Sequence, residues 1–173
     1  NKVNGIVVGT GDLSEIALGW STYNADHISM YNVNAGLPKT VIQFMILKMS
    51  DWEEYESLNS ILKDIVETPI SPELIPTEGN NAQNTEQIIG PYEVHDVILY
   101  YFIKHSYKPQ IIFFILQRIF GEKYSNLELV NWLEIFFKRF FSNQFKRNCI
   151  PDGIKIGSVS LSPRGDWRMA SDT

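Results

Sequence analysis

A short β-branched run that stops at glycines and opens directly into a helical pattern constrains this chain more than any other feature. Val7 and Val8 precede Gly9-Thr10-Gly11, after which apolar residues are spaced as on one face of a helix. The pattern predicts a strand at residues 6–8, a turn, and a helix over residues 12–20. In α/β proteins the backbone N–H groups at such a corner bind phosphate.

Two carboxylates, Asp12 and Glu15, fall on the first turn of this predicted helix. They would repel a bare phosphate, but they suit a phosphate carried with Mg²⁺, which proteins hold through one or two carboxylates. The same spacing is that of a capping box, in which Asp12 accepts from the N–H of Glu15 and Glu15 reaches back. On spacing alone a cap is favoured over a metal site.

Helical periodicity continues after Pro38, which suits the first position of a helix, and after Asp51, which with Glu54 predicts a cap. Both helices carry apolar stripes that we expect to be core. The stripes are Val41, Ile42, Met45, Ile46 and Met49 in the first helix, and Trp52, Tyr55, Leu58, Ile61, Leu62 and Ile65 in the second.

Further helices are predicted over residues 92–105 and 109–120, and from a capping box at Ser125 and Glu128 onward. Three stretches lack a steady period. Residues 22–36 are expected to form a loop that shapes a site. Residues 68–91 are expected to be mobile without ligand and to close as a lid, because long loops inside compact domains are often functional. After Cys149 the chain is expected to run extended over an existing surface.

The composition bounds the class of protein. With 173 residues, of which 44% are hydrophobic, the chain can bury the core of one domain, and disorder is excluded. The net charge of -5 argues against a nucleic-acid partner. The segment from Lys138 onward, however, carries seven Lys or Arg against three Asp, which suits anionic small molecules such as nucleotides.

The cellular setting follows from what the sequence contains. Cys149 is the single cysteine, and no apolar run reaches membrane-spanning length. We therefore expect a cytoplasmic protein with no membrane partner. Asn1 stands almost directly before the predicted strand, without a start methionine, which suggests a piece of a longer chain.

Several long motifs together resemble the synthetase domain of glutamine-dependent NAD synthetase, in the same order and over nearly the whole chain. They are Gly9-Thr10-Gly11-Asp12-Leu13-Ser14-Glu15, Leu18-Gly19-Trp20-Ser21-Thr22-Tyr23, Tyr31 to Thr40, Gln83-Asn84-Thr85-Glu86, Ile89 to Glu93, Phe145-Lys146-Arg147 and Ser158 to Met169. The resemblance implies an α/β, Rossmann-like domain of the adenine nucleotide alpha-hydrolase type. Residues 1–173 would be its mostly helical C-terminal portion.

The family uses ATP and Mg²⁺ to adenylate the nicotinate carboxylate of deamido-NAD, and ammonia from glutamine then displaces AMP. By resemblance, Thr10, Lys39 and Ser71 would contact ATP. Considered without the family, Lys39 is an ordinary exposed lysine at a helix start. A cation is, however, disfavoured at that end of a helix, which favours a functional role.

The dinucleotide side of the site is also implied by the resemblance. Glu15 would bind the metal or deamido-NAD, and Glu86 would close over the substrate. Lys146 and Asp166 would be catalytic, with Lys146 also contacting deamido-NAD; without the family they would be a solvated helix end and a turn in the tail. The deamido-NAD pocket would be lined by Trp20, Ser21, Thr22 and Tyr23.

Two departures from the family pattern bear on activity. Asn84 stands where the family usually has lysine, and the Ser-Gly-Gly-x-Asp-Ser pyrophosphate loop and the glutaminase domain are not in the sequence. The chain alone is therefore expected to be inactive, while the family implies a homodimer or larger homo-oligomer. The alternatives are a non-catalytic fragment or interaction module that retains the fold, and another amidotransferase of the ATP-pyrophosphatase type.

Overall fold

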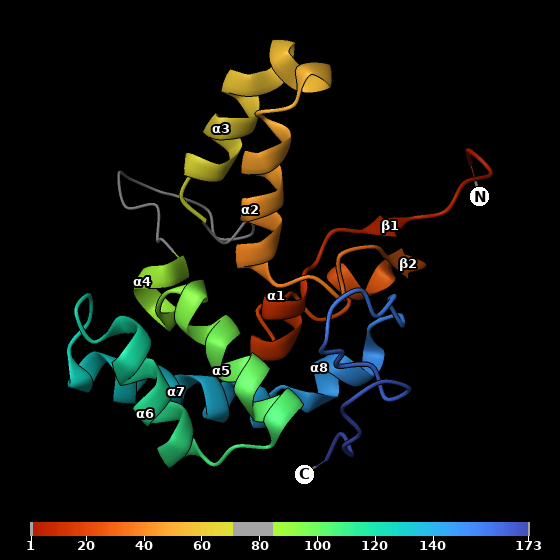
Figure 1. Ribbon diagram of the computed structural model, residues 1–173. Helices are drawn as coiled ribbons and strands as arrows, with labels where there is room; N and C mark the ends of the chain where they lie inside the picture. Colours follow the sequence, from red (N-terminus) through yellow and green to blue (C-terminus); the bar gives the residue numbers. More distant parts are fainter. Residues whose placement is uncertain (1, 71–84, 173) are drawn as a thin grey trace, which may run out of the picture.

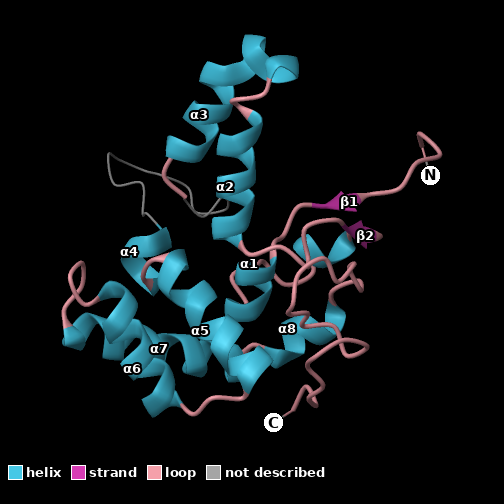
Figure 2. Cartoon of the chain, viewed as in Figure 1, coloured by secondary structure: helices cyan, strands magenta, loops and turns pink. Residues whose placement is uncertain are grey.

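The computed structural model describes residues 2–70 and 85–172, and within them helices predominate over two short strands (Figure 2). In chain order the elements are β1 (Val8–Gly9), α1 (Leu13–Leu18), the 3₁₀ helix η1 (Asp26–Ile28), β2 (Tyr31–Asn32), α2 (Lys39–Met49), the 3₁₀ helix η2 (Glu53–Leu58), α3 (Asn59–Glu67), α4 (Thr85–Ile89), α5 (Tyr92–His105), α6 (Pro109–Phe120), α7 (Asn126–Ser142) and α8 (Gln144–Cys149). None of the helices described is long and apolar enough to cross a bilayer.

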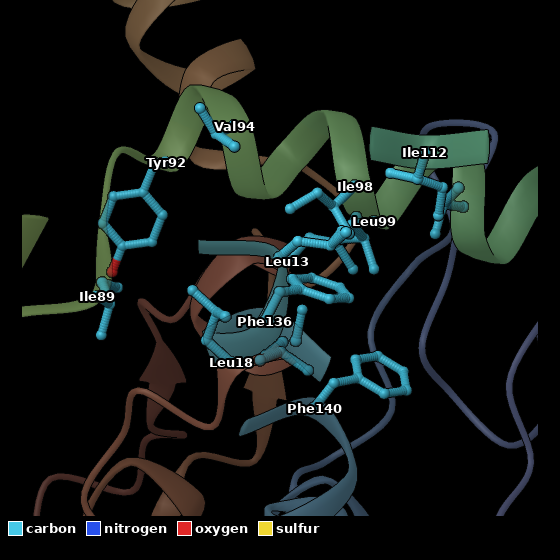
Figure 3. Close-up of a cluster of buried hydrophobic side chains, with 14 of the residues drawn as sticks. Leu13, Leu18, Ile89, Tyr92, Val94, Ile98, Leu99, Ile112, Phe136 and Phe140 are labelled. Carbon is cyan, nitrogen blue, oxygen red and sulfur yellow. The ribbon is translucent and has the colours of Figure 1, made fainter. Parts of the chain in front are cut away.

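The hydrophobic core lies among α1, α5, α6 and α7 (Figure 1). Leu13 and Leu18 of α1 point toward residues of α5 and α7, including Phe136 and Phe140 (Figure 3). Both phenylalanines are fully buried. Burying a side chain of this kind is worth about 1.5–3 kcal/mol, so the cluster fixes the short helix α1 against the helical body.

Local signals in the sequence predict the helical body correctly. Helices α5 and α6 begin and end at the predicted residues, with Pro109 in the first turn of α6 and Gly121 directly after its end. Helix α7 starts at the predicted capping box. The side chain of Ser125 accepts from the N–H of Glu128 at 3.3 Å, and the Glu128 carboxylate accepts from the N–H of Ser125 at 2.8 Å. These predictions are confirmed.

Helix α1 ends at Gly19, whose φ of 59° places it in the left-handed region. A Cβ at this position would lie 2.3 Å from the Cβ of Asn143, which is far inside van der Waals contact. Glycine therefore lets the chain turn sharply beneath α7 and carry Trp20 away from the helix axis.

Strands β1 and β2 form a parallel pair, with Val8 beside Tyr31 and Gly9 beside Asn32. The strand lies slightly later than predicted, and β2 and η1 fall within residues 22–36, which were expected to be loop. A two-residue strand carries no alternation that a sequence pattern could reveal. Among the residues described, β1 is not covered on both faces, since Val8 is 50% exposed.

Helices α2 and α3 project from the core as a hairpin (Figure 1). The prediction that their apolar stripes are core is wrong, because no residue of either helix, both described in full, is buried. Phe44 is 59% exposed and Ile61 is 54% exposed. The predicted cap of Asp51 with Glu54 is also wrong, since η2 follows instead and lacks a side-chain cap.

The segment after Cys149 is extended and packs on the helical body, as predicted. The ring of Trp167 lies 4.9 Å from that of Phe140, centre to centre, and its indole N–H donates to Gln144 Oε1 at 3.0 Å. Val159 and Leu161 of this segment are also buried, as part of the hydrophobic core. The tail thereby covers part of α7 and α8.

Candidate functional site

A cleft of about 1040 Å³ opens beside β1, the N-terminal part of α1 and the start of α2. Its walls also include residues 68–70, Thr85 and side chains from α7 and α8. Seven of the residues predicted to bind substrates line it: Thr10, Glu15, Trp20, Ser21, Thr22, Lys39 and Lys146.

Lys39 forms a close ionic cluster with two carboxylates at one end of this cleft. Its Nζ lies 2.6 Å from Asp12 Oδ2 and 2.9 Å from Glu15 Oε1. The capping box of α1 uses the other two oxygens, because Asp12 Oδ1 accepts from the N–H of Glu15 at 2.9 Å and Glu15 Oε2 accepts from the N–H of Asp12 at 3.1 Å. The predicted cap is therefore present, and all four carboxylate oxygens accept hydrogen bonds.

Burial and the mutual charges of the three side chains together set the protonation of this cluster. Burial raises the pKa of Asp12 to about 6, helped by repulsion from Glu15 and only partly offset by Lys39. Burial works to lower the pKa of Lys39, but the charges and hydrogen bonds of the two carboxylates outweigh it and raise that pKa. Lys39 is thus cationic at neutral pH, and its charge is compensated within the protein.

Residues of α1 and α5 fix the direction of Lys39. Helix α2 has Pro38 at its N-cap position and no cap of its own. Instead, the N–H of Lys39 donates to Ser14 Oγ at 2.8 Å, and the N–H and hydroxyl of Thr40 donate to Asp96 Oδ2 at 3.2 and 2.6 Å. The Ser14 hydroxyl in turn donates to Asp96. This network supplies a cap from outside the helix, at the point where Lys39 enters the cleft.

Two cationic side chains from α7 and α8 hold the other end of α1. Arg139 Nε donates to the carbonyl of Leu18 at 3.0 Å, and Lys146 Nζ donates to those of Gly19 and Ser21 at 2.9 and 2.8 Å. Cations are favoured at a helix C-terminus, where carbonyls lack partners. Lys146 is therefore not a solvated helix end, because it fixes the backbone that carries Trp20 and Ser21.

Of the predicted site residues that the structure describes, Tyr23, Glu86 and Asp166 do not line the cleft. The Tyr23 ring packs 5.6 Å from that of Phe145, centre to centre. Asp166 pairs with Lys155, whose Nζ lies 2.8 Å from Asp166 Oδ2, and also accepts from the N–H of Ser160 at 2.8 Å. The hydrogen bond from Lys155 lowers the pKa of Asp166.

The segment predicted to be a lid, residues 68–91, is described only at its two ends. Ser71 and Asn84 lie outside the described residues. The two ends meet beside the cleft, where the N–H of Thr85 donates to the carbonyl of Ile70 at 2.8 Å. Glu86 accepts a hydrogen bond from the N–H of Tyr92 at 3.0 Å. The lid itself stays a prediction.

Comparison with known proteins bears on what this cleft does. No family model matches the chain. The chain is 41% identical over 192 residues to the glutamine-dependent NAD(+) synthetase of Mycobacterium tuberculosis, an alignment that covers 99% of this chain and 28% of that relative. The enzyme of the same name from Mycobacterium leprae is 40% identical over 195 residues, with the same coverage. This chain is homologous to glutamine-dependent NAD(+) synthetases. It spans 28% of the length of these mycobacterial relatives.

A solved structure of a glutamine-dependent NAD(+) synthetase from Cytophaga hutchinsonii has the same fold. The TM-score is 0.71 at 18% identity, and the match covers 96% of this chain and 24% of that structure. The predicted fold, a mostly helical portion of a synthetase domain, is therefore confirmed. The sequence resemblance is confirmed as well.

The carboxylates of Asp12 and Glu15, as arranged here, do not fit a metal site. Each of their oxygens already accepts from Lys39 or from a capping N–H. Within residues 2–70 and 85–172 no group of three or more His, Cys, Asp or Glu side chains could hold a metal ion. Binding of Mg²⁺ at Glu15 stays a prediction, and no chemical step is assigned to it.

Two residues that shape this cleft were not predicted from the sequence. Arg139 lies among the aromatic residues of α7, and the only trace of it in the sequence is the charged pair at residues 138–139 that interrupts them. Asp96 sits in the middle of α5, where an acidic residue usually faces water, yet it is largely buried against α1 and α2. The signal available in the sequence was an acidic residue within a largely apolar helical stretch, since a carboxylate is rarely buried unless it has partners.

Proposed function

We propose that this chain is the C-terminal portion of the synthetase domain of an enzyme that converts deamido-NAD to NAD. In the proposed reaction, a nicotinate carboxylate oxygen attacks the α-phosphorus of ATP and pyrophosphate leaves. Ammonia then attacks the acyl carbon of this adenylate, AMP leaves, and the nitrogen loses a proton. A domain outside this chain would release the ammonia from glutamine. The chain spans only part of its relatives, so the activity is proposed for the complete protein.

One observation carries the proposal. Residues that the family resemblance implies for substrate binding come from separate stretches of the sequence, around residues 10–15, 20–22, 39 and 146, and they line one cleft. Its volume of about 1040 Å³ is large enough for nucleotide ligands. A random scatter of family motifs over a fold would not produce this convergence.

The residues have distinct proposed tasks. Thr10, between β1 and α1, and Lys39, at the start of α2, would hold ATP, and Ser71 would assist them. Trp20 offers an aromatic face for a base or a pyridine ring, beside a backbone fixed by Lys146. Positioning of this kind is a large source of rate acceleration for a reaction between two bound substrates. The contacts of deamido-NAD with Glu15, Tyr23 and Glu86, and the catalytic role of Asp166, remain part of the proposal.

The test is the deamido-NAD-dependent release of AMP and pyrophosphate by the complete enzyme supplied with ATP and ammonia. Replacing Lys146 by Met should abolish most of this activity, whereas replacing the exposed Lys138 on α7 by Met should leave it unchanged. If the intact enzyme binds deamido-NAD but forms neither AMP nor NAD, the non-catalytic alternative is correct. Turnover with a different carboxylate, and none with deamido-NAD, would identify another amidotransferase.

A homo-oligomer belongs to the same proposal. Its support is the exposed apolar face of α2, η2 and α3, which includes Phe44, Trp52, Ile61 and Ile65. Exposed patches of this kind mark interaction surfaces. Sedimentation of the complete enzyme should give a dimer or a larger assembly, and Ile61→Asp should reduce its mass. An unchanged mass would show that a second copy does not cover this face.

A further inference from the structure

The positive charges in the cleft are not equivalent. Lys39 is neutralised by Asp12 and Glu15. Arg139 and Lys146, beside Trp20 at another part of the cleft, form no ion pair with any of the residues described. Asp26, which also lines the cleft, acts on Lys146 through its charge, whereas no carboxylate among the described residues acts on Arg139. An anionic ligand group would therefore be most strongly attracted at Arg139.

Arg139 is held in a fixed orientation with most of its donors unused. Its Nε donates to the Leu18 carbonyl at 3.0 Å, and its guanidinium lies 4.6 Å from the centre of the Trp20 ring. Neither Nη has a hydrogen-bond partner among the described residues, although a guanidinium carries five N–H donors. A planar fork fixed in this way suits two oxygens of a carboxylate or phosphate.

Capping of α1 alone does not account for this residue. The Leu18 carbonyl needs one donor, and Asn143 Nδ2 also approaches it at 3.5 Å. Burial lowers the pKa of Arg139, which reflects the cost of placing a charge here without a counter-ion. An anion that completes the site would remove that cost.

Unpartnered hydroxyl groups in the same cleft are an independent sign of a ligand. Ser21 Oγ and Thr85 Oγ1 are both buried and have no hydrogen-bond partner within residues 2–70 and 85–172, and both residues line the cleft. Buried polar groups without partners are rare in native proteins and suit a partner from outside the chain, such as water or a ligand. Ser21 directly follows Trp20, on which the Arg139 guanidinium lies.

We propose that Arg139 is an anion-binding residue of the cleft, and that its two Nη groups bind an anionic oxygen pair of a dinucleotide lying against Trp20. The inference rests on the proposed function for the identity of the dinucleotide. The oxygens belong either to the pyridine carboxylate or to the pyrophosphate, and binding measurements separate the two. Deamido-NAD and NAD share the pyrophosphate, but only deamido-NAD has the carboxylate.

The experiment is calorimetric titration of the complete enzyme, without ATP, with deamido-NAD, NAD and inorganic pyrophosphate. Arg139→Gln should weaken the affinity for deamido-NAD by about tenfold to about a hundredfold, the loss expected for charged hydrogen bonds. An equal loss for NAD assigns the oxygens to the pyrophosphate, and an unchanged NAD affinity assigns them to the carboxylate. Arg118→Gln, on the exposed side of α6, is the matched control and should bind like the wild type.

Arg139→Lys keeps the charge and can still donate to Leu18, but it loses the planar fork. It should fold with an unchanged denaturation midpoint and still bind deamido-NAD at least about fivefold more weakly, which guards against a folding defect in Arg139→Gln. Unchanged affinity of Arg139→Lys and Arg139→Gln for all three ligands would overturn the proposal. If the wild type binds pyrophosphate but not deamido-NAD, and Arg139→Gln loses the pyrophosphate, the anion site stands and the proposed function fails.

Discussion

Glu15 shows how one side chain can serve folding and function with different atoms. Oε2 completes the cap of α1, and Oε1 pairs with Lys39 in the cleft. A glutamine can keep an oxygen on the N–H of Asp12, but it cannot keep the charge opposite Lys39. The two roles can therefore be separated by one isosteric substitution.

Glu15→Gln in the complete enzyme should lower NAD formation by at least about tenfold, or about 1.4 kcal/mol of transition-state stabilisation, because Lys39 loses half of its counter-charge. The thermal midpoint should change little, since the cap persists. Glu128→Gln is the control, because Glu128 completes the same kind of capping box on α7 and pairs with no lysine in the part of the chain that the structure describes. If both variants keep normal turnover, Glu15 is only a cap.

Individual residues of the cleft differed in how far the sequence could reveal them. Glu15 and Lys39 stand in contiguous motifs, so the sequence alone singled them out. Their mutual contact depends on the crossing of α1 and α2, which no local pattern encodes. Arg139 lies more than a hundred residues from Leu18, and the pairing exists only because α7 packs against α1.

Among the elements, α2 depends for its N-terminus on residues of other helices. The N–H of Lys39 has Ser14 Oγ as its acceptor, and Ser14 is 1% exposed. Ser14→Ala should lower the free energy of unfolding by about 1 kcal/mol, the usual value of a lost cap. Urea denaturation measures this loss.

Ser158→Ala is the control for that change, because Ser158 is exposed in the extended tail. Its effect should stay within about 0.5 kcal/mol. Equal effects of the two substitutions would mean that the α2 terminus finds another acceptor. The cap would then be irrelevant to the position of Lys39.

The accuracy of the sequence predictions also varied by element for a physical reason. Helices α5 and α6 were placed correctly because Pro109 and Gly121 act locally. The stripes of α2 and α3 were correctly seen as apolar but wrongly placed in the core, since periodicity reveals a face and not its covering. Strand β2 escaped notice because it exists through pairing with β1.

At the scale of the whole molecule, the structure consists of a helical body and a cleft beside it. Helices α5, α6 and α7 form the body, and α1 packs against it (Figure 1). The cleft is lined by residues before and after α1 and by Arg139 and Lys146 of α7 and α8. The stability of the body therefore bears on the geometry of the cleft. A buried histidine between α5 and α7 provides a way to measure that stability.

His95 should make the stability of the molecule depend on pH. Its Nε2 donates to the carbonyl of Ile89 at 2.7 Å, and its ring lies against Phe136, centre to centre at 6.1 Å. A carbonyl can only accept, so the neutral ring carries its proton on Nε2, and Nδ1 is buried without a partner among the residues described. A second proton on Nδ1 would create a buried charge with no acceptor. Burial, reinforced by the nearby charge of Arg139 and partly opposed by the bond to Ile89, lowers the pKa of His95 to about 4.

The unfolded chain binds the His95 proton below its ordinary pKa of about 6.5, whereas the folded chain does so only near the lowered value. Stability is therefore fully present above about pH 6.5 and is lost as the pH falls toward about 4. Between about pH 7.5 and about pH 5 the free energy of unfolding should fall by about 2 kcal/mol from this group alone.

Urea denaturation at the two pH values should show this loss in the wild type and in His105→Gln, whose histidine is exposed at the end of α5. His95→Gln, which cannot titrate, should lose about 2 kcal/mol less over the same range. Equal losses in His95→Gln and the wild type would show that another group governs the acid sensitivity of the fold.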